Sequence, residues 1–226
     1  MDQSRTTQLL GEAVVRRLGQ VRVLLVGVGG VGGWCAEALI RSGIQHLTIV
    51  DFDTVSTSNI NRQIVATEAN VGRSKVEEMR QRLLDIHPQA DIVAIDERVV
   101  PGEAWRERIG NYDYIIDAID DVDAKAWLLY EGSLTQATVF SSMGAGRKLD
   151  TEQIQIAEFW KVHGCPLARA LRNRMKKEHR IPAKKIRCVY SPEISAEAGT
   201  IAPIVGVFGM KLANLLIQNE VARMSE

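Results

Sequence analysis

Short, continuously apolar runs alternate with longer amphipathic stretches over the first part of the chain. The short runs are rich in β-branched residues and predict strands at residues 21–26, 46–50, 91–95, 112–119 and 138–143. The stretches between them carry apolar side chains at helical spacing and predict helices at residues 31–42, 71–86, 103–109 and 122–136. Because the strand runs do not alternate with polar residues, they are typical of strands buried on both faces. The pattern therefore predicts an α/β fold with a doubly wound, mostly parallel sheet.

The spacing of apolar and polar residues changes after Gly144. Residues 149–159 alternate between apolar and polar with period two, which favours an antiparallel strand. A basic helical stretch follows, then a strand at residues 185–190 and a final helix at about residues 205–220. We therefore expect a core over residues 1–146, and a smaller antiparallel and helical elaboration of the same domain over residues 147–226.

Composition and charge restrict the class of protein. The 226 residues are 46% hydrophobic and 25% charged, which is ordinary for a globular chain with a sizeable core. Basic and acidic residues each number 28, so the overall charge does not favour a protein that coats nucleic acid. None of the three cysteines belongs to a CxxC pair, which excludes a disulfide scaffold and a four-thiolate zinc site. We expect no zinc.

Two segments bear on the location of the protein. The first residues contain no apolar run, so we expect no secretory signal. The apolar stretch at residues 201–217 is interrupted by Pro203, Gly206, Gly209 and Lys211, and it gives no confident membrane span. We therefore expect a cytoplasmic protein.

A glycine-rich segment follows the first predicted strand and opens the first predicted helix. Its glycines are Gly27, Gly29, Gly30 and Gly32, and they allow a tight turn in which phosphate approaches backbone N–H groups. Asp51 ends the second strand, where a carboxylate can accept hydrogen bonds from ribose hydroxyls. Together these features predict a Rossmann-like nucleotide site, and a glycine turn without a ligand is the alternative.

Further charged residues favour ATP over a dinucleotide. Arg62 offers a planar fork for phosphate oxygens and Lys75 a point charge, and both suit the charge that develops during displacement at phosphorus. Asp120 follows the fourth predicted strand, where it is well placed to hold Mg²⁺. Each residue also has an ordinary structural explanation: a surface charge for Lys75, a salt bridge for Arg62, and a helix cap for Asp120 or Asp121.

Four motifs in order, GVGGVG, DFDTVSTSNINRQ, VGRSKVE and DAIDD, resemble the adenylating domain of the ubiquitin-like-protein activating enzymes. The molybdopterin- and thiamine-biosynthesis adenylyltransferases share this domain. The resemblance spans residues 7 to 146, which implies that this part is a nucleotide-binding adenylating core. It implies a reaction of ATP with a carboxylate that yields an acyl-adenylate and pyrophosphate. ATP and Mg²⁺ are the implied cofactors, and a monovalent cation is left open.

The resemblance also implies roles for single residues. Gly30 would lie at the phosphate turn and Asp51 on the ribose. Ser58, Asn59 and Arg62 would line the nucleotide, with Asn59 and Arg62 nearest its phosphates.

The charged residues further along the chain complete this set. Lys75 would contact the triphosphate, Asp120 would hold Mg²⁺, and Asp121 would adjoin it. Arg62, Lys75 and Asp120 are therefore the catalytic residues that the resemblance implies.

Other segments point to one branch of this family. RTTQLLGE, SSMGAGRKLDTEQIQIAEFWKVHGCPLARALRNRMKK and CVYSPE resemble the tRNA threonylcarbamoyladenosine dehydratases. This implies that ATP activates the side-chain carboxylate of the modified adenosine, which then closes a ring with net loss of water. It also implies a homodimer with tRNA as its substrate, and it leaves open a sulfur-transfer partner protein. The segment between Glu193 and the final helix is shorter here than in that branch.

A basic stretch supports a tRNA substrate independently of the resemblance. Residues 169–187 hold nine lysines and arginines and one acid, Glu178, although the whole chain is neutral. Such segregated charge suits contact with a phosphate backbone, and a solvated helix with a basic loop is the alternative. The residues that we expect to contact tRNA are Arg172, Lys176, Lys177, Lys184 and Lys185.

Two other functions stay open. One is an adenylyltransferase that activates the C-terminal carboxylate of a ubiquitin-like or sulfur-carrier protein, which the missing CxxC pairs and the basic stretch disfavour. The other is a nucleotide-binding module or an NAD-dependent oxidoreductase, which would not require Arg62, Lys75 and Asp120 around the glycine turn.

Overall fold

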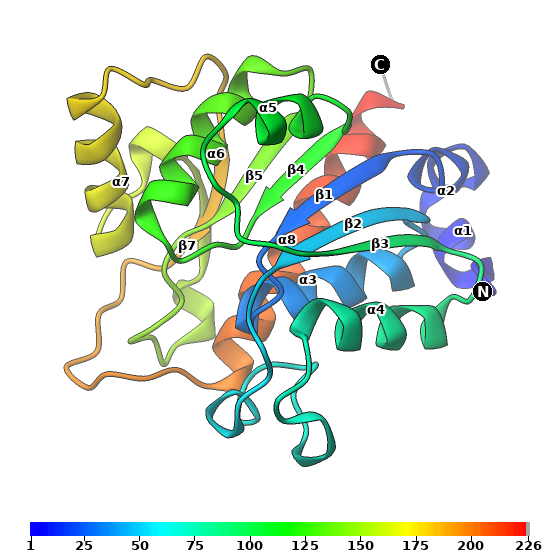
Figure 1. Ribbon diagram of the computed structural model, residues 1–226. Coiled ribbons are helices and arrows are strands. Elements are labelled where there is room, and N and C mark those ends of the chain that lie inside the picture. Colours follow the sequence, from blue (N-terminus) through cyan, green and yellow to red (C-terminus); the bar gives the residue numbers. More distant parts are fainter. Residues whose placement is uncertain (225–226) are drawn as a thin grey trace.

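One mostly parallel sheet organises the protein in a computed structural model that describes residues 1–224. Within those residues the sheet has seven strands in the order β3-β2-β1-β4-β5-β7-β6 (Figure 1). Every neighbouring pair is parallel except β6 and β7. The strands are β1 Arg22–Val26, β2 His46–Asp51, β3 Asp91–Asp96, β4 Tyr114–Asp117, β5 Thr138–Ser142, β6 Gln155–Glu158 and β7 Arg187–Tyr190. The predicted doubly wound α/β class is confirmed.

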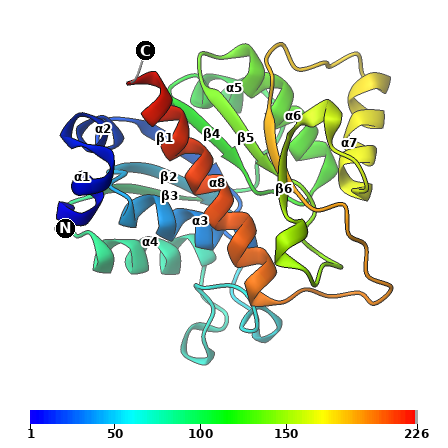
Figure 2. The same cartoon turned by 180° about the vertical axis from the view of Figure 1, so that it is seen from behind.

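Helices cover both faces of the sheet (Figures 1 and 2). α3, α4 and α8 pack on one face, and α5, α6 and α7 pack on the other. Two short N-terminal helices, α1 and α2, precede the first strand and were not predicted. The helices are α1 Ser4–Leu10, α2 Glu12–Leu18, α3 Gly30–Arg41, α4 Lys75–Ile86, α5 Glu103–Ile109, α6 Val122–Leu134, α7 Pro166–Lys177 and α8 Ala202–Arg223.

Alternation along the central strand explains why both faces of the sheet are covered. In β1, Val23 and Leu25 join the hydrophobic cluster beneath α3 and α8. Leu24 and Val26 point the other way, into the cluster beneath α5 and α6. Each fully buried side chain of this size stabilises the fold by about 1.5–3 kcal/mol relative to exposure, so both faces of the sheet favour a covering layer of helices.

Several predicted boundaries are wrong, for local reasons. The helix predicted at residues 71–86 starts only at Lys75, because Gly72 has a φ of 88° and Ser74 bridges back to Thr54. The strand predicted at residues 112–119 covers only Tyr114–Asp117, after which the chain leaves the sheet. The final helix begins at Ala202, and Pro203 lies in its first turn, where a missing N–H costs nothing.

The C-terminal elaboration also differs from its prediction in extent. Strand character within residues 149–159 is confined to β6, which short 3-10 turns flank on both sides (η3 Thr151–Gln153 and η4 Phe159–Lys161). The side chain of Asp150 caps the first turn, and that of Glu158 caps the second. Strand β7 is shorter than predicted, at Arg187–Tyr190, but it joins the same sheet as β1.

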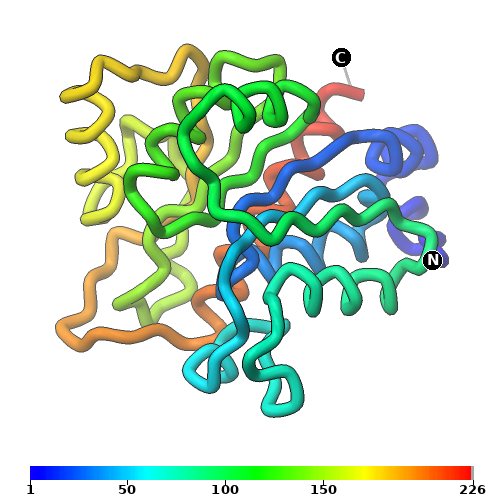
Figure 3. Tube along the Cα trace, in the orientation of Figure 1, coloured from blue at the N-terminus to red at the C-terminus, as the bar shows by residue number. Residues whose placement is uncertain are grey.

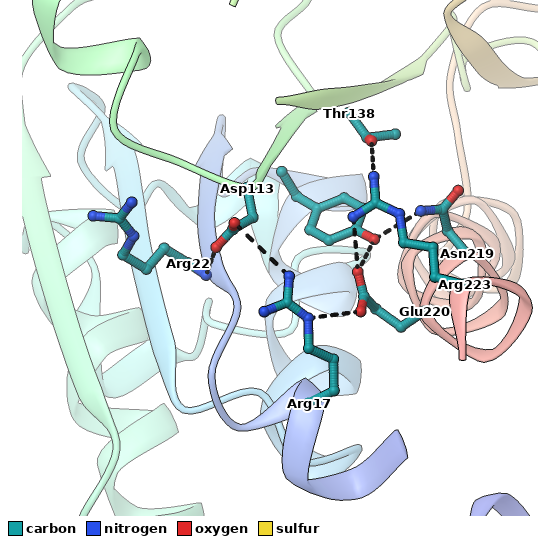
Figure 4. Close-up of polar contacts among 8 residues, drawn as sticks. Arg17, Arg22, Asp113, Thr138, Asn219, Glu220 and Arg223 are labelled. Atoms are coloured by element: carbon teal, nitrogen blue, oxygen red, sulfur yellow. Dashed lines mark hydrogen bonds and ion pairs between the residues drawn. The ribbon is translucent and has the colours of Figure 1, made fainter. Parts of the chain in front are cut away.

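A buried polar cluster joins the final helix to the N-terminal end of β4, away from the strands' C-terminal edge (Figure 4). Glu220 is only 1% exposed, accepts a hydrogen bond from the Tyr114 hydroxyl and pairs with Arg17 at 3.0 Å. Asn219 donates to the same hydroxyl at 2.8 Å. Burial raises the pKa of Tyr114, so its hydroxyl stays protonated and donates to the carboxylate. Glu220 thus links α8 to α2 through Arg17 and to β4 through Tyr114.

Two long connections extend from the opposite edge of the sheet (Figure 3). Residues 52–74 leave β2, and residues 191–201 run from β7 to the start of α8. Asn61 Nδ2 donates to the carbonyl oxygen of Thr200 at 3.2 Å and joins the two connections. Within residues 1–224, no helix combines the length and the apolar character needed to cross a membrane.

Candidate nucleotide-binding site

The glycine turn after β1 is built by backbone contacts that leave no room for side chains. Gly27 has a φ of 90°, and a Cβ there would lie 2.7 Å from the carbonyl oxygen of Ala118. A Cβ on Gly32 would lie 1.8 Å from the carbonyl oxygen of Gly27. Gly29 and Gly30, by contrast, face a cavity, and the N-terminus of α3 presents free N–H groups to it. The turn therefore has the geometry of an anion site.

The cavity lies at the carboxyl ends of the parallel strands. Its volume is about 370 Å³, and β1 and β4 flank it at the point where the strand order reverses direction. Ligands of open α/β sheets bind at such a point. The predicted residues that line it are Gly27, Gly29, Gly30, Asp51, Asn59, Arg62, Lys75, Asp120 and Asp121. Ser58 and Gly32 lie outside this lining: Ser58 is exposed on η1 (Thr57–Asn59), and Gly32 is packed inside the turn.

Asp51 connects the end of β2 to the glycine turn. Its Oδ2 accepts a hydrogen bond from the N–H of Val28 at 2.8 Å. Its Oδ1 accepts from the N–H groups of Phe52 and Asp53 at 2.9 and 3.0 Å. A carboxylate has about four acceptor positions and three are used here, so about one remains for a hydroxyl of a ligand.

Arg62 and Lys75 reach the cavity from the connection after β2. Lys75 is only 5% exposed, and its Nζ lies 2.7 Å from Asp53 Oδ2. Arg62 Nη1 donates to the carbonyl oxygen of Ser58 at 2.7 Å and to Asn61 Oδ1 at 2.9 Å. Asn59 is buried, and its Oδ1 accepts from the N–H of Ser56 at 3.1 Å, which shapes the η1 turn. Arg62 therefore stands at the cavity on a folded, internally bonded loop, and Lys75 at the first residue of α4.

Two neighbouring acids at the end of β4 have different environments. Asp121 caps α6 by accepting from the N–H of Ala124 at 2.8 Å, and it lies 3.8 Å from Arg98. Asp120 is exposed to the cavity, and within residues 1–224 its carboxylate has no hydrogen bond or ion pair. From the sequence, either acid could have capped α6. The structure shows that Asp121 is the cap, so Asp120 is free to bind a ligand.

Sequence reasoning did not single out three other residues that line the cavity. Gln63 is 7% exposed, and its Oε1 has no hydrogen-bond partner among the described residues. Buried amides are normally satisfied, so this oxygen is available to accept a hydrogen bond from a polar group in the cavity. The guanidinium of Arg98 lies 4.2 Å from the ring centroid of Phe52, at the side of the cavity near Asp51. The sequence contained two signals that could have identified these residues. Gln63 directly follows Arg62, and Phe52 lies between two acids.

A magnesium ion fits this set of donors only in company with a nucleotide. Within residues 1–224, no group of three or more His, Cys, Asp or Glu side chains could hold a metal ion by itself. Mg²⁺ is usually held by one or two carboxylates together with phosphate oxygens and water. The free carboxylate of Asp120, which lines the cavity together with the glycine turn, supplies that kind of ligand.

The segment between β7 and α8 is held firmly along the rim of the site. Arg147 donates to the carbonyl oxygens of Ser195 and Ala196, both at 2.9 Å. Lys148 is only 3% exposed and donates to the carbonyl oxygen of Glu193, and burial lowers its pKa. Through these bonds the short connection is ordered against the chain that follows β5.

The predicted tRNA-contact residues fall into two groups. Arg172 and Lys184 donate hydrogen bonds to carbonyl oxygens of the chain, and within residues 1–224 the others do not. Arg172 Nη1 donates to the carbonyl oxygens of Phe159 and Val162 at 3.1 and 2.8 Å, so it braces the fold. Lys184 donates to the carbonyl oxygen of Thr135.

The other three of these residues are exposed on or beyond α7. Lys176 lies 5.8 Å from the ring centroid of Trp160, an aromatic residue that the basic stretch itself lacks. Lys177 and Lys185 are exposed, and neither forms an ion pair with an acid among the described residues. α7 begins beside the cavity, because Leu167 in its first turn lines the wall.

The cysteines do not contribute a nucleophile to the site. Cys35, Cys165 and Cys188 are all buried and unpaired. Burial raises the pKa of the Cys35 and Cys188 thiols, which disfavours the reactive thiolate. The chemistry of the cavity therefore rests on its charged and backbone groups.

Comparison with known proteins identifies the family. The ThiF family matches the chain over residues 2–220. The tRNA threonylcarbamoyladenosine dehydratase of Escherichia coli (strain K12) is 36% identical over 193 residues, which are 83% of this chain and 72% of that protein. The crystal structure of the E. coli tRNA N6-threonylcarbamoyladenosine dehydratase with ATP superposes with a TM-score of 0.92 at 32% identity, covering 98% of this chain and 94% of that one. The corresponding structure with AMP gives a TM-score of 0.93 at 33% identity, covering 99% and 95%. The chain belongs to the ThiF family.

Proposed function

We propose that this protein uses ATP to dehydrate threonylcarbamoyladenosine in tRNA. The observation that carries the proposal is the cavity itself, in which the glycine turn, Arg62, Lys75 and Asp120 converge at the point where the strand order reverses. The similarity to dehydratase structures that bind ATP and AMP supports both the nucleotide and the substrate class.

The reaction needs ATP because a free carboxylate is a poor electrophile. Its leaving group would be oxide. In the first step, an oxygen of the substrate carboxylate attacks the α-phosphorus of ATP, and pyrophosphate leaves. In the second step, a nucleophile of the same side chain attacks the activated carbonyl carbon and releases its proton to solvent, and AMP leaves with the former carboxylate oxygen. The ring thus closes with net loss of water, at the expense of one ATP.

The residues of the cavity suit the first step. Pyrophosphate gains charge as it leaves, and donors that are already in place stabilise such charge. Lys75 reaches the phosphates by exchanging Asp53 for them, and Arg62 by turning from the carbonyl oxygen of Ser58. Both exchanges replace one hydrogen-bond acceptor by another, so neither cation is left unpaired.

Two acids complete the nucleotide site in this proposal. Asp51 binds the ribose hydroxyls from the end of β2. Asp120 holds Mg²⁺, which when bound would neutralise charge on the phosphate oxygens. Ser58 and Asn59 act through the shape of the η1 turn, which precedes Arg62 and contacts its guanidinium.

The exposed cations of α7 and the loop after it form the tRNA-binding face of the proposal. α7 starts at the cavity wall, so a tRNA that lies along Lys176 and Lys177 could place its modified adenosine in the site. Contacts of this kind are made to phosphate and depend strongly on salt. We further propose a cytoplasmic homodimer. A sulfur-transfer partner and a monovalent cation in the site stay open.

The proposal is tested by nucleoside analysis of the tRNA. Total tRNA that contains threonylcarbamoyladenosine is incubated with the protein and Mg·ATP, digested, and examined by mass spectrometry. We expect the modified nucleoside to lose the mass of one water, with ATP consumed in equal amount. A ubiquitin-like protein with a C-terminal glycine serves as the rival substrate. Adenylation of that protein, with no change in the tRNA nucleoside, would contradict the proposal and favour the adenylyltransferase alternative.

A further inference from the structure

We propose that Lys125, in the first turns of α6, is a positioning residue that holds the backbone beside Asp120 in place for a metal-bound nucleotide. The inference rests on the proposed function, because it assumes that Asp120 holds Mg²⁺. Lys125 does not line the cavity and acts through the chain that does.

The first observation is a fully buried ion pair directly beneath the site. Lys125 Nζ lies 2.7 Å from Asp117 Oδ2, and both side chains are 0% exposed. Ser141 on β5 donates to the same oxygen at 2.6 Å. Buried ion pairs lose much of their attraction to desolvation, so apolar side chains could fill this space at least as stably. The stability of the core therefore does not explain the pair.

The second observation is that the pair also holds the backbone next to Asp120. Lys125 Nζ donates to the carbonyl oxygen of Ile119 at 2.9 Å. The N–H of Ile119 donates to Asp117 Oδ1 at 3.1 Å. Both peptide groups of Ile119 are thus tied to the buried pair, and the next residue is the free acid of the cavity.

The third observation is that the same backbone forms the floor of the glycine turn. The N–H of Ala118 donates to the carbonyl oxygen of Val26 at 2.8 Å. The carbonyl oxygen of Ala118 lies so close to Gly27 that a Cβ on Gly27 would lie 2.7 Å from it. A displaced Ile119 would therefore move Asp120 relative to the phosphate turn, and groups one shell behind a metal ligand commonly alter metal affinity by about 10- to 100-fold.

The other end of β4 offers a matched control. Tyr114 and Glu220 also form a buried polar contact, but at the N-terminal end of β4, away from the cavity at its other end. Tyr114→Phe removes this contact and perturbs the same strand without reaching Asp120. A variant that merely loosens the fold should behave like this control.

The experiment compares two neutral replacements of the buried pair. Lys125→Met with Asp117→Asn removes both charges and the donor to Ile119. Lys125→Gln with Asp117→Asn removes both charges and keeps an N–H donor. ATP binding is measured by calorimetry as a function of free Mg²⁺, at a temperature well below unfolding. We expect the methionine variant to need about tenfold more Mg²⁺ for half-maximal binding. The glutamine variant and Tyr114→Phe should stay within about threefold of the unaltered protein.

Each outcome decides one of the two proposals. An unchanged Mg²⁺ requirement in the folded methionine variant would overturn the positioning role and leave the proposed function standing. Equal increases in the methionine variant and in Tyr114→Phe would also overturn it. If the methionine variant does not fold, Ser141→Ala replaces it; we expect a smaller increase, and no increase would contradict the inference. If the unaltered protein binds no ATP, the proposed function itself fails.

Discussion

Lys75 Nζ lies 2.7 Å from Asp53 Oδ2, at the point where the first turn of α4 meets the loop after β2. The lysine side chain is 6% exposed, whereas the aspartate side chain is half exposed. The N–H of Lys75 also donates to the carbonyl oxygen of Asp53 at 3.0 Å. A buried cation at the cavity is thus paired with an acid that lies two residues from Asp51, and in the proposed function phosphate replaces that acid.

Loss of this ammonium should affect the chemistry of the site more than the fold. We expect Lys75→Met to lower the rate of ATP consumption by about 10²- to 10³-fold, because one preorganised donor to developing charge is removed. Asp53→Asn is the control, since it removes the resting partner and leaves the cation, and its effect should be much smaller. Steady-state kinetics would contradict this role if Lys75→Met kept the rate within a few-fold.

The two acids after β4 should respond in opposite ways. Asp120→Ala should abolish Mg·ATP turnover and leave the melting temperature unchanged, because the exposed carboxylate has no partner in the described fold. Asp121→Ala removes the cap of α6 and should cost about 0.5–2 kcal/mol of stability. Turnover and thermal melts of both variants test this division. Turnover that survives in Asp120→Ala would remove this residue as the metal ligand.

The cations of α7 should separate into those that bind tRNA and one that supports the fold. Replacing Lys176 and Lys177 with Glu should weaken tRNA binding and flatten its dependence on salt, because contacts to phosphate release counterions. Arg172→Met should instead lower the melting temperature, since the carbonyl oxygens of Phe159 and Val162 lose their donor. Filter binding over a range of salt concentrations measures the first effect. An unchanged salt slope would exclude Lys176 and Lys177 from the interface.

Low pH should weaken the ion pair that joins α5 to α6. Arg106 on α5 contacts Glu131 on α6 through two hydrogen bonds, at 2.9 and 2.8 Å, and holds the pKa of Glu131 below its usual 4.5. A depressed carboxyl pKa stabilises the fold above that usual value, and the contribution is lost as pH falls through the lower folded pKa. Glu131→Gln should therefore lower the melting temperature at neutral pH, and the difference should shrink below about pH 4. A difference that stayed constant with pH would contradict the assignment.

Periodicity predicted the regular elements well and the loops poorly. Apolar runs buried on both faces, such as β1, and the amphipathic spacing of α4 are local signals that the sequence carries directly. The start of α4 depended on a bridge between Thr54 and Ser74, which no local pattern announces. α1 and α2 have few buried residues, so their apolar spacing was too weak to predict.

The same distinction applies to the site. The residues of the glycine turn, Asp51 and Asp120 lie in or directly after strands, so their convergence followed from the fold class. The buried pair of Lys125 and Asp117 could not be predicted, because an aspartate in a strand and a lysine in a helix have many possible partners. The structural contacts of Arg172 could not be predicted for a related reason: a basic helix does not show which of its cations also bind carbonyl oxygens of the chain.

The central claim is that the cavity couples ATP consumption to the carboxylate of a modified tRNA. The most direct test is the release of pyrophosphate from Mg·ATP with two preparations of total tRNA, from cells that retain threonylcarbamoyladenosine and from cells that lack it. A ubiquitin-like protein and a reaction without substrate complete the set. The account predicts release that is stimulated by the modified tRNA alone. Equal release with both tRNA preparations, or stimulation by the small protein instead, would contradict it.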